Sequence, residues 1–182
     1  MSAGQEALAG AGIANLISST IRDVRDYPQP GIIFKDITPL LADGAALTAV
    51  VGALAAGHGR VDKVAGIEAR GFILAAPVAV ALGAGFVPVR KEGKLPGRTI
   101  ARTYQLEYGT ATLEVHQDAF GAGDRVLIVD DVLATGGTAA ATADLVRNSG
   151  ADVIAIAVLL ELGFLHGRAQ LPGLEVRSLL VT

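Results

Sequence analysis

The pattern of hydrophobic and polar residues predicts helices and strands that alternate along the chain. Apolar residues recur at helical spacing between residues 3 and 26, with Arg22, Asp23 and Arg25 on the other side, which predicts a peripheral N-terminal helix. Continuous apolar runs predict buried strands at residues 126–129 and 153–160, and further strands are predicted at residues 61–67 and 85–90. Helices are predicted beside these strands, at residues 47–56, 72–82 and 139–148.

This alternation predicts an α/β fold with a doubly wound, parallel central sheet flanked by helices. The chain shows no internal repeat and no interdomain linker, and 182 residues suit a single domain with one core. The uncharged stretch from Gly71 to Val89 approaches the length of a membrane span, but prolines and glycines interrupt it. We therefore expect a buried helix, a turn and a strand there, and no membrane segment.

Residues 90–98 differ in composition, because they are basic, rich in glycine and proline, and poor in apolar side chains. This composition predicts a mobile loop. The residues that follow alternate well enough for two strands, at 103–109 and 111–116, joined by a turn at Gly109 and Thr110. We interpret residues 90–116 as a hinged lid; the alternative is a solvated basic loop on a surface hairpin.

Residues 126–138 combine a buried strand with candidate binding chemistry. The apolar run ends at Asp130 and Asp131, which places two carboxylates at the carboxyl edge of the sheet, where such folds bind ligands. The small residues from Ala134 to Thr138 then lead into an Ala-rich helix with Gly137 or Thr138 as its cap, and they leave backbone N–H groups open to an anion. A ribose 5-phosphate fits both parts, with its phosphate on the loop and its hydroxyls, or a cation, on the acids.

The same loop disfavours other nucleotide chemistry. It carries no lysine, so it is not a P-loop, and no GxGxxG run follows a strand, so ATP hydrolysis and dinucleotide binding are disfavoured. The alternative to an anion-binding loop is an ordinary strand, turn and helix.

A second corner between a strand and a helix is predicted at Glu68 to Gly71. It either presents Arg70 to an anion or holds it as a surface arginine that caps a loop.

Composition narrows the class of function. The 15 basic and 18 acidic residues give a net charge of −3 without a basic block, so the footprint of a nucleic-acid-binding protein is missing. The chain has no cysteine, and its N-terminus lacks a basic region, which together predict a cytoplasmic protein without disulfides or thiolate catalysis. The three histidines are isolated in sequence, so no metal site held by protein ligands is predicted.

The run from Val129 to Thr138 resembles the phosphoribosyl pyrophosphate motif of the type I phosphoribosyltransferases. Other stretches make the chain similar to the adenine-specific members of that family, from Arg22 to Leu180. The resemblance implies the family's central parallel sheet flanked by helices, with a small hood at residues 27–40 and a flexible lid hairpin at 90–116. It also implies transfer of the 5-phosphoribosyl group from phosphoribosyl pyrophosphate to adenine, giving AMP and pyrophosphate in purine salvage, by a homodimer.

The resemblance implies how the phosphoribosyl group is held. The 5-phosphate would lie on the loop formed by Ala134, Thr135, Gly136, Gly137 and Thr138. Asp130 and Asp131 would bind the ribose hydroxyls. Mg²⁺ would arrive with the substrate, held by its diphosphate and ribose oxygens and only loosely by the acids.

The resemblance also implies groups for the pyrophosphate and the base. Arg70 and Lys91 would bind the pyrophosphate, and the loop that starts at Glu68 can hold a cis peptide bond. Glu107 would act as general base or acid near the purine N9, with Tyr108 near the leaving group.

Three residues would contact the purine: Ile33, Phe34 and Leu162. From the residues alone, a core strand with a buried Phe34 is the alternative. Lys35 stands where family members often carry arginine, which keeps the charge and loses the planar fork.

Three further alternatives concern function. Another purine or pyrimidine specificity would keep the same mechanism with a different base. A protein of another class, a regulator that senses phosphoribosyl pyrophosphate, would keep the motif and lose catalysis, although the chain has no room for a DNA-binding domain at its N-terminus. A generic nucleotide-binding scaffold would be insensitive to Glu107→Gln.

Overall fold

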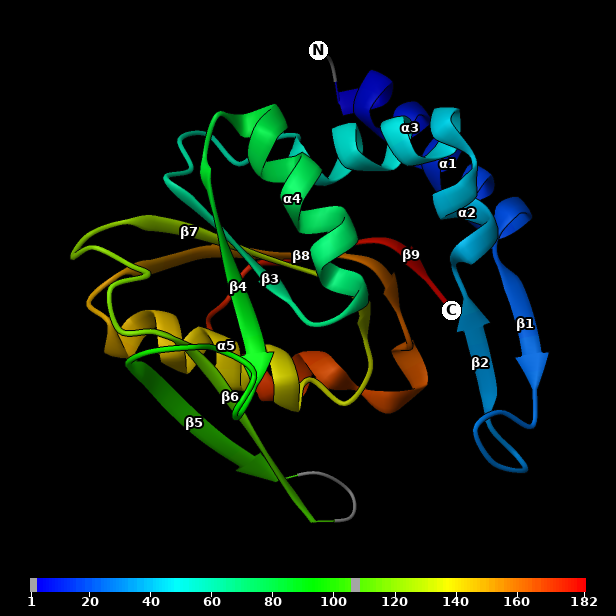
Figure 1. Cartoon of the computed structure of the whole chain (residues 1–182). Coiled ribbons are helices and arrows are strands. Elements are labelled where there is room, and N and C mark those ends of the chain that lie inside the picture. Colours follow the sequence, from blue (N-terminus) through cyan, green and yellow to red (C-terminus); the bar gives the residue numbers. More distant parts are fainter. Residues whose placement is uncertain (1–2, 106–108) are drawn as a thin grey trace. The chain divides into compact units, whose positions relative to one another are not determined.

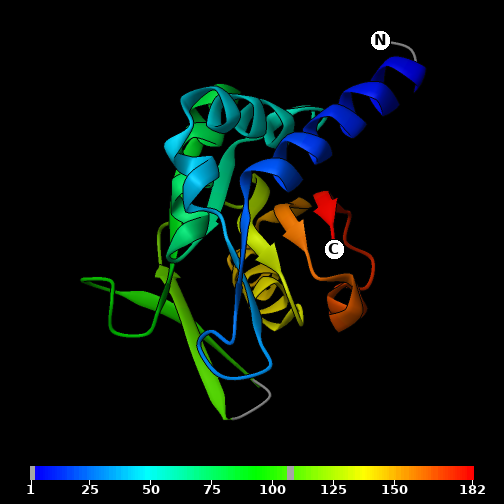
Figure 2. The ribbon, with the colours of Figure 1, turned by 90° about the vertical axis from the view of Figure 1, so that its right-hand side faces the viewer.

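The computed structural model describes residues 3–105 and 109–182 and divides into two compact units, Met1–Ala53 and Leu54–Thr182. The first unit contains helix α1 (Ala3–Thr20), strands β1 (Arg22–Arg25) and β2 (Ile33–Asp36), and helices α2 (Thr38–Ala42) and α3 (Gly44–Ala55). Figure 2 shows α1 as one straight helix that leads into β1. Asp43 begins α3, since its carboxylate accepts hydrogen bonds from the backbone N–H groups of Ala45 and Ala46 at 2.9 and 3.0 Å.

The predicted N-terminal helix is shorter than expected, since it ends at Thr20 and not at Asp26. The hydroxyl of Thr20 donates to the carbonyl of Leu16 at 2.6 Å, in the last turn of the helix. The residues that follow pair antiparallel with β2. Opposite charges face each other across this pair, Arg22 with Asp36 at 2.6 Å and Asp23 with Lys35 at 2.8 Å, which favours the strand over another helical turn.

The second unit is built on a seven-stranded sheet with the order β5-β6-β4-β3-β7-β8-β9. The strands are β3 (Lys63–Ile67), β4 (Gly85–Lys91), β5 (Thr99–Gln105), β6 (Thr110–His116), β7 (Arg125–Leu133), β8 (Asp152–Glu161) and β9 (Val176–Val181). All neighbours are parallel except β6, which pairs antiparallel with β4 and with β5. The parallel sheet predicted from the sequence is confirmed, with an antiparallel hairpin added at one edge.

Two helices cover the sheet of the second unit. Helix α4 (Arg70–Leu82) packs on β3, β4 and β7, whereas α5 (Gly137–Asn148) packs on β5, β6, β7 and β8, and Figure 1 shows them on opposite faces. The connection through α4 leads to β4 on one side of β3, and the connection through α5 leads to β8 on the far side of β7. The strand order therefore reverses between β3 and β7, which is where an open α/β sheet forms its ligand crevice.

The helix predicted at residues 72–82 is confirmed as α4, with Pro77 inside it. It begins two residues earlier than predicted, at Arg70, and Gly83 follows its end in the left-handed conformation. Between β8 and β9 the chain forms two short 3₁₀ helices, η1 (Gly163–Leu165) and η2 (Gly167–Gln170). In the part of the chain that the structure describes, no helix combines the length and apolar character needed to cross a membrane.

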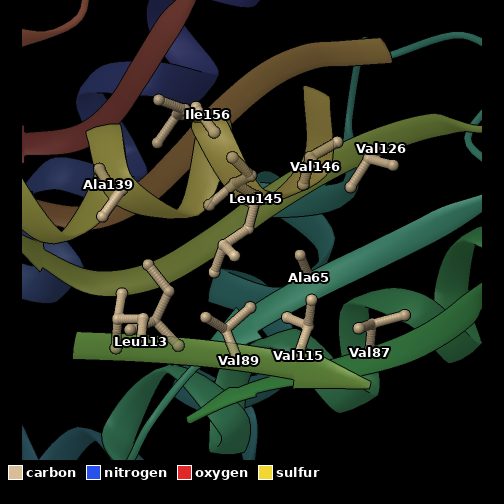
Figure 3. Packing of buried hydrophobic residues seen from close by; sticks show 14 of the residues in the cluster. Ala65, Val87, Val89, Leu113, Val115, Val126, Ala139, Leu145, Val146 and Ile156 are labelled. Carbon is tan, nitrogen blue, oxygen red and sulfur yellow. The ribbon is translucent and has the colours of Figure 1, made fainter. Parts of the chain in front are cut away.

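The core of the second unit lies between the sheet and α5. Figure 3 shows Leu145 and Val146 of α5 packed with strand residues that include Val89 and Leu113, all of them buried. Burial of one such aliphatic side chain is worth about 1.5–3 kcal/mol. This packing fixes α5 against the sheet, so the loop that enters the helix is held in a defined place.

Candidate active site

Asp130 and Asp131 lie where the sheet opens at its carboxyl edge. Strand β7 does not stop at Val129 as predicted; it stays paired with β8 as far as Leu133. Its pairing with β3, in contrast, ends at Val129. The two aspartates are therefore the first residues of β7 beyond its partner β3, and they face the crevice between the two strands.

The environment of the two carboxyls raises the pKa of both. Loss of solvent raises the pKa of Asp130 well above its ordinary range, and the charge of Asp131 beside it raises it further. Burial also raises the pKa of Asp131, against the opposing effect of the Arg70 guanidinium. The carboxyl oxygens of the pair can accept hydrogen bonds from the hydroxyl groups of a sugar.

Arg70 reaches the acid pair from the first residue of α4. Its Nη2 lies 2.8 Å from Oδ2 of Asp131, a contact that brings opposite charges together. The contact lacks hydrogen-bond geometry, so this buried oxygen accepts no hydrogen bond from the described residues. A ligand hydroxyl or a cation can therefore use Oδ2.

The corner before Arg70 is closely packed. The peptide bond between Glu68 and Ala69 is cis, as the resemblance implied. The Glu68 carboxylate accepts a hydrogen bond from Nε of Arg90 at 2.8 Å. Gly71 makes room for the acids, since a Cβ at this position would lie 2.6 Å from Oδ1 of Asp130. This lets the first turn of α4 lie against the end of β7.

The residues from Ala134 to Thr138 form the loop that enters α5. The N-cap is Gly136, in the left-handed conformation with φ of 87°, and not Gly137 or Thr138 as predicted. Among the described residues no side chain caps the helix, so the N–H groups of its first turn remain available to an anion. Position 136 needs glycine for two reasons: its backbone is left-handed, and a Cβ there would collide with the carbonyl oxygen of Gly167.

Two adjoining pockets bring most of the predicted site residues together. The larger has a volume of about 460 Å³ and is lined by residues that include Arg70, Lys91, Asp130, Asp131 and Thr138. The smaller, of about 70 Å³, is lined by Asp130, Ala134, Thr135, Gly136 and Thr138, among others. Because Ile67, Asp130 and Thr138 line both, the pockets form one continuous site along the carboxyl edge.

Two predicted residues lie beside these pockets without lining them. The backbone N–H of Leu162 donates to the carbonyl of Leu133 at 2.9 Å, which holds Leu162 next to the end of β7. Gly137 faces Tyr104, whose ring carbon Cδ2 would lie 3.1 Å from a Cβ at this glycine. Contact of Leu162 with a base stays a prediction.

The predicted hood residues lie on β2 in the first unit. Ile33 is 51% exposed, and Phe34 is partly buried with its ring 5.2 Å from that of Tyr27, in an edge-to-face arrangement. The ammonium of Lys35 donates to both carboxylate oxygens of Asp23, at 2.8 and 3.0 Å. Their role in holding a purine stays a prediction.

The predicted lid contains an anchored loop. Oε1 of the buried Glu114 accepts hydrogen bonds from the backbone N–H groups of Lys94 and Leu95, at 3.0 and 2.9 Å. The carbonyl of Pro96 lies 2.9 Å from Nε2 of His116. The hairpin is confirmed, with β5 starting earlier than predicted, at Thr99, and ending at Gln105. Glu107 and Tyr108, the predicted proton-transfer and leaving-group residues, lie outside the described residues.

The sequence interpretation assigned no role to Tyr104 or Glu114. The hydroxyl of Tyr104 lies 3.0 Å from Oγ1 of Thr138, and Tyr104 lines the larger pocket. Strict alternation with Leu113 and Val115 would expose Glu114, whereas all three are buried. The paired glycines at 136 and 137 were an indication that another segment approaches this loop closely.

Comparison with known proteins agrees with this geometry. A model of the phosphoribosyl transferase domain family matches residues 40–170. The adenine phosphoribosyltransferase of Acidothermus cellulolyticus is 63% identical over 172 residues, which cover 93% of this chain and 97% of the relative.

Solved structures give the same result. That of adenine phosphoribosyltransferase from Rhodothermus marinus has a TM-score of 0.90 and 51% identity, and covers 94% of this chain and 99% of that one. That of the Saccharomyces cerevisiae enzyme, complexed with an imino-altritol bisphosphate and adenine, has a TM-score of 0.85 and 36% identity, and covers 93% and 99%. The chain belongs to the phosphoribosyltransferase family and, within it, to the adenine phosphoribosyltransferases.

Proposed function

We propose that the chain transfers the 5-phosphoribosyl group of phosphoribosyl pyrophosphate to adenine, giving AMP and pyrophosphate in purine salvage. One observation carries the proposal: the crevice between β3 and β7 joins a helix N-terminus that no described side chain caps to an acid pair, half-buried Asp130 and buried Asp131, and to an arginine. The family model spans residues 40–170, across the boundary of the two units, which supports a single phosphoribosyltransferase domain in residues 1–182.

The phosphoribosyl group fits the continuous site in one orientation. Its 5-phosphate lies on the loop Ala134 to Thr138, where backbone N–H groups and the positive end of α5 attract it. Its ribose hydroxyls lie on Asp130 and Asp131. The opposite orientation would bring the phosphate against two acids.

Arg70 and Lys91 bind the pyrophosphate in this proposal, and their position in the lining of the larger pocket, together with the acids, supports this role. The ring nitrogen N9 of adenine attacks C1′ of the ribose while the bond from C1′ to the pyrophosphate oxygen breaks. The electron pair leaves with pyrophosphate, where the two cations stabilise the charge. Glu107 takes the proton from N9, and closure of the lid at residues 90–116 keeps water from the cationic ribose.

Mg²⁺ fits this site as a companion of the substrate. The described residues contain no group of three or more His, Cys, Asp or Glu side chains that could hold a metal ion alone. Asp131 Oδ2 is nevertheless buried without a hydrogen bond, which suits a substrate-borne cation or its ligated hydroxyls. When bound, the ion neutralises diphosphate charge as the bond breaks.

Adenine is the proposed base because the relatives are named adenine phosphoribosyltransferases and the Saccharomyces cerevisiae structure is a complex with adenine. Ile33 and Phe34 supply apolar surface for a purine, Leu162 adds a side chain at the end of β8, and Lys35 adds a charge to the hood. A binding pocket of this kind separates bases by their exocyclic groups.

The assembly and location proposed are a homodimer in the cytoplasm. Val80 on α4 is 82% exposed and Ile73, seven residues earlier on the same face, is 46% exposed. A second copy of the chain would cover such apolar side chains. Light scattering during gel filtration tests this: we expect twice the mass of the chain, and a monomer at micromolar concentration would contradict it.

The proposed location is the cytoplasm. A chain that has no cysteine is compatible with such a reducing compartment.

Pyrophosphate release tests the reaction. Purified protein with Mg²⁺ and phosphoribosyl pyrophosphate is offered adenine, hypoxanthine, guanine or orotate in separate reactions. We expect release with adenine alone. Release with a different base would refute the base assignment and keep the mechanism, whereas tight binding of phosphoribosyl pyrophosphate without release would indicate a sensor.

A further inference from the structure

Tyr104 of β5 is attached to the phosphate loop at the first turn of α5. Its hydroxyl lies 3.0 Å from Oγ1 of Thr138, across 34 residues of sequence. Its ring covers Gly137, where a Cβ would lie 3.1 Å from Cδ2. Both groups of the hydroxyl pair are partly buried, and both residues line the larger pocket beside Asp130.

Once a phosphate is bound, the hydroxyl of Thr138 can form hydrogen bonds with both the phosphate and the Tyr104 hydroxyl in only one arrangement. A threonine hydroxyl has one hydrogen and two lone pairs, and a phosphate oxygen only accepts. If the hydrogen of Thr138 points to the phosphate, the Tyr104 hydroxyl must donate to Oγ1. This order, from Tyr104 to Thr138 to phosphate, polarises the second bond toward an anion and strengthens it.

We propose that Tyr104 is a positioning residue, which orients the hydroxyl of Thr138 toward the 5-phosphate of the substrate. The inference rests on the proposed function, since it assigns Thr138 to phosphoribosyl pyrophosphate. Tyr104 itself does not touch the reacting atoms. Because Tyr104 lies on β5 of the hairpin, the hydrogen bond also ties the phosphate loop to the predicted lid segment.

The chain provides a matched control for this hydrogen bond. Arg102, two residues earlier on β5, forms an ion pair with Asp144 of α5 at 2.8 Å, and both side chains are partly exposed. This pair joins the same strand to the same helix without contact with Thr138. Arg102→Gln therefore loosens the hairpin from α5 and leaves the orientation of the Thr138 hydroxyl unchanged.

The test measures binding of phosphoribosyl pyrophosphate with Mg²⁺ by calorimetry, together with the KM values for both substrates. Tyr104→Phe keeps the ring and removes the hydroxyl. We expect affinity for phosphoribosyl pyrophosphate to fall about fivefold to tenfold, and the KM for adenine to stay within about twofold of wild type. Arg102→Gln should leave both unchanged. In a Thr138→Val background, Tyr104→Phe should have no further effect.

Three results would overturn the inference: unchanged affinity in Tyr104→Phe, an equal loss in Arg102→Gln, or a further loss in the Thr138→Val background. Failure of the proposed function is a separate result. A wild-type protein that binds phosphoribosyl pyrophosphate but transfers it to no base refutes that function, and the calorimetric comparison of the variants still decides the role of Tyr104.

Discussion

Asp130 and Asp131 are neighbouring acids whose pKa values the folded state raises. Burial raises both pKa values, and the charge of Asp131 raises that of Asp130 further; the Arg70 guanidinium, a hydrogen bond with the Asp130 side chain and backbone hydrogen bonds oppose the rise at Asp131. The same features suit the pair to sugar hydroxyls. Stability is therefore reduced at the residues on which binding depends.

The raised pKa of Asp130 predicts a pH dependence of stability. A carboxyl whose pKa is higher in the folded state binds more protons there, so the free energy of unfolding falls as pH rises from the ordinary carboxyl value of about 4 toward the raised one. Asp130→Asn removes this titration. Urea unfolding between pH 4.5 and 7.5 should show a flatter pH profile and greater stability near neutral pH for Asp130→Asn; parallel profiles would contradict the pKa assignment.

Gly136 gives a second prediction at a single residue. Gly136→Ala should lower the free energy of unfolding by about 1–2 kcal/mol for the left-handed backbone and by about 1–3 kcal/mol more for the collision with Gly167. Gly123 is the control, since it has a similar φ of 77° and open space around it. Thermal unfolding should show the larger loss for Gly136→Ala. Equal losses would mean that the collision is relieved at no cost.

At the scale of elements, Glu114 connects strand β6 to the loop at residues 92–98. Burial acts to raise the pKa of Glu114, but hydrogen bonds from the backbone of Leu95 and from Thr99 and Lys94 outweigh it, so the pKa is lowered. A lowered pKa means that the carboxylate stabilises the loop above its ordinary pKa and that this contribution is lost as pH falls. The base of the lid is thus held by one buried charge.

Glu114→Gln should loosen this loop, because the amide lacks the negative charge that the two N–H groups require. We expect the amides of Lys94 and Leu95 to exchange with solvent about five to ten times faster at neutral pH. Hydrogen exchange read by NMR would measure this. Glu92→Gln, at an exposed position of the same loop, should leave both rates unchanged; equal acceleration by the two variants would contradict the anchoring role.

Local pattern predicted most elements of the second unit, because alternation of apolar strands and helices specifies a doubly wound sheet and places residues 68–71 and 130–138 at one edge. The residues that were missed depend on long-range pairing. Tyr104 meets Thr138 only after β5 and β6 add to β4 as an antiparallel edge. The β1 strand likewise depends on ion pairs with β2, which helical periodicity does not reveal.

At the scale of the whole molecule, ligand binding should stabilise the fold as a unit. A ligand at 100 times its dissociation constant adds about 2.7 kcal/mol, which corresponds to a rise of roughly 5–10 °C in melting temperature for a chain of this size. We expect AMP to give this shift. Gly136→Ala should show a much smaller one, because its phosphate loop is displaced. An equal shift in both proteins would place AMP away from the loop.

A crystal structure of the protein with AMP is the most direct test of the proposed site. We expect the phosphate on the backbone N–H groups of residues 135–138, with the Thr138 hydroxyl donating to it, and the ribose hydroxyls within hydrogen-bond distance of Asp130 and Asp131. An AMP phosphate bound at Arg70, or a ribose remote from the two acids, would contradict it.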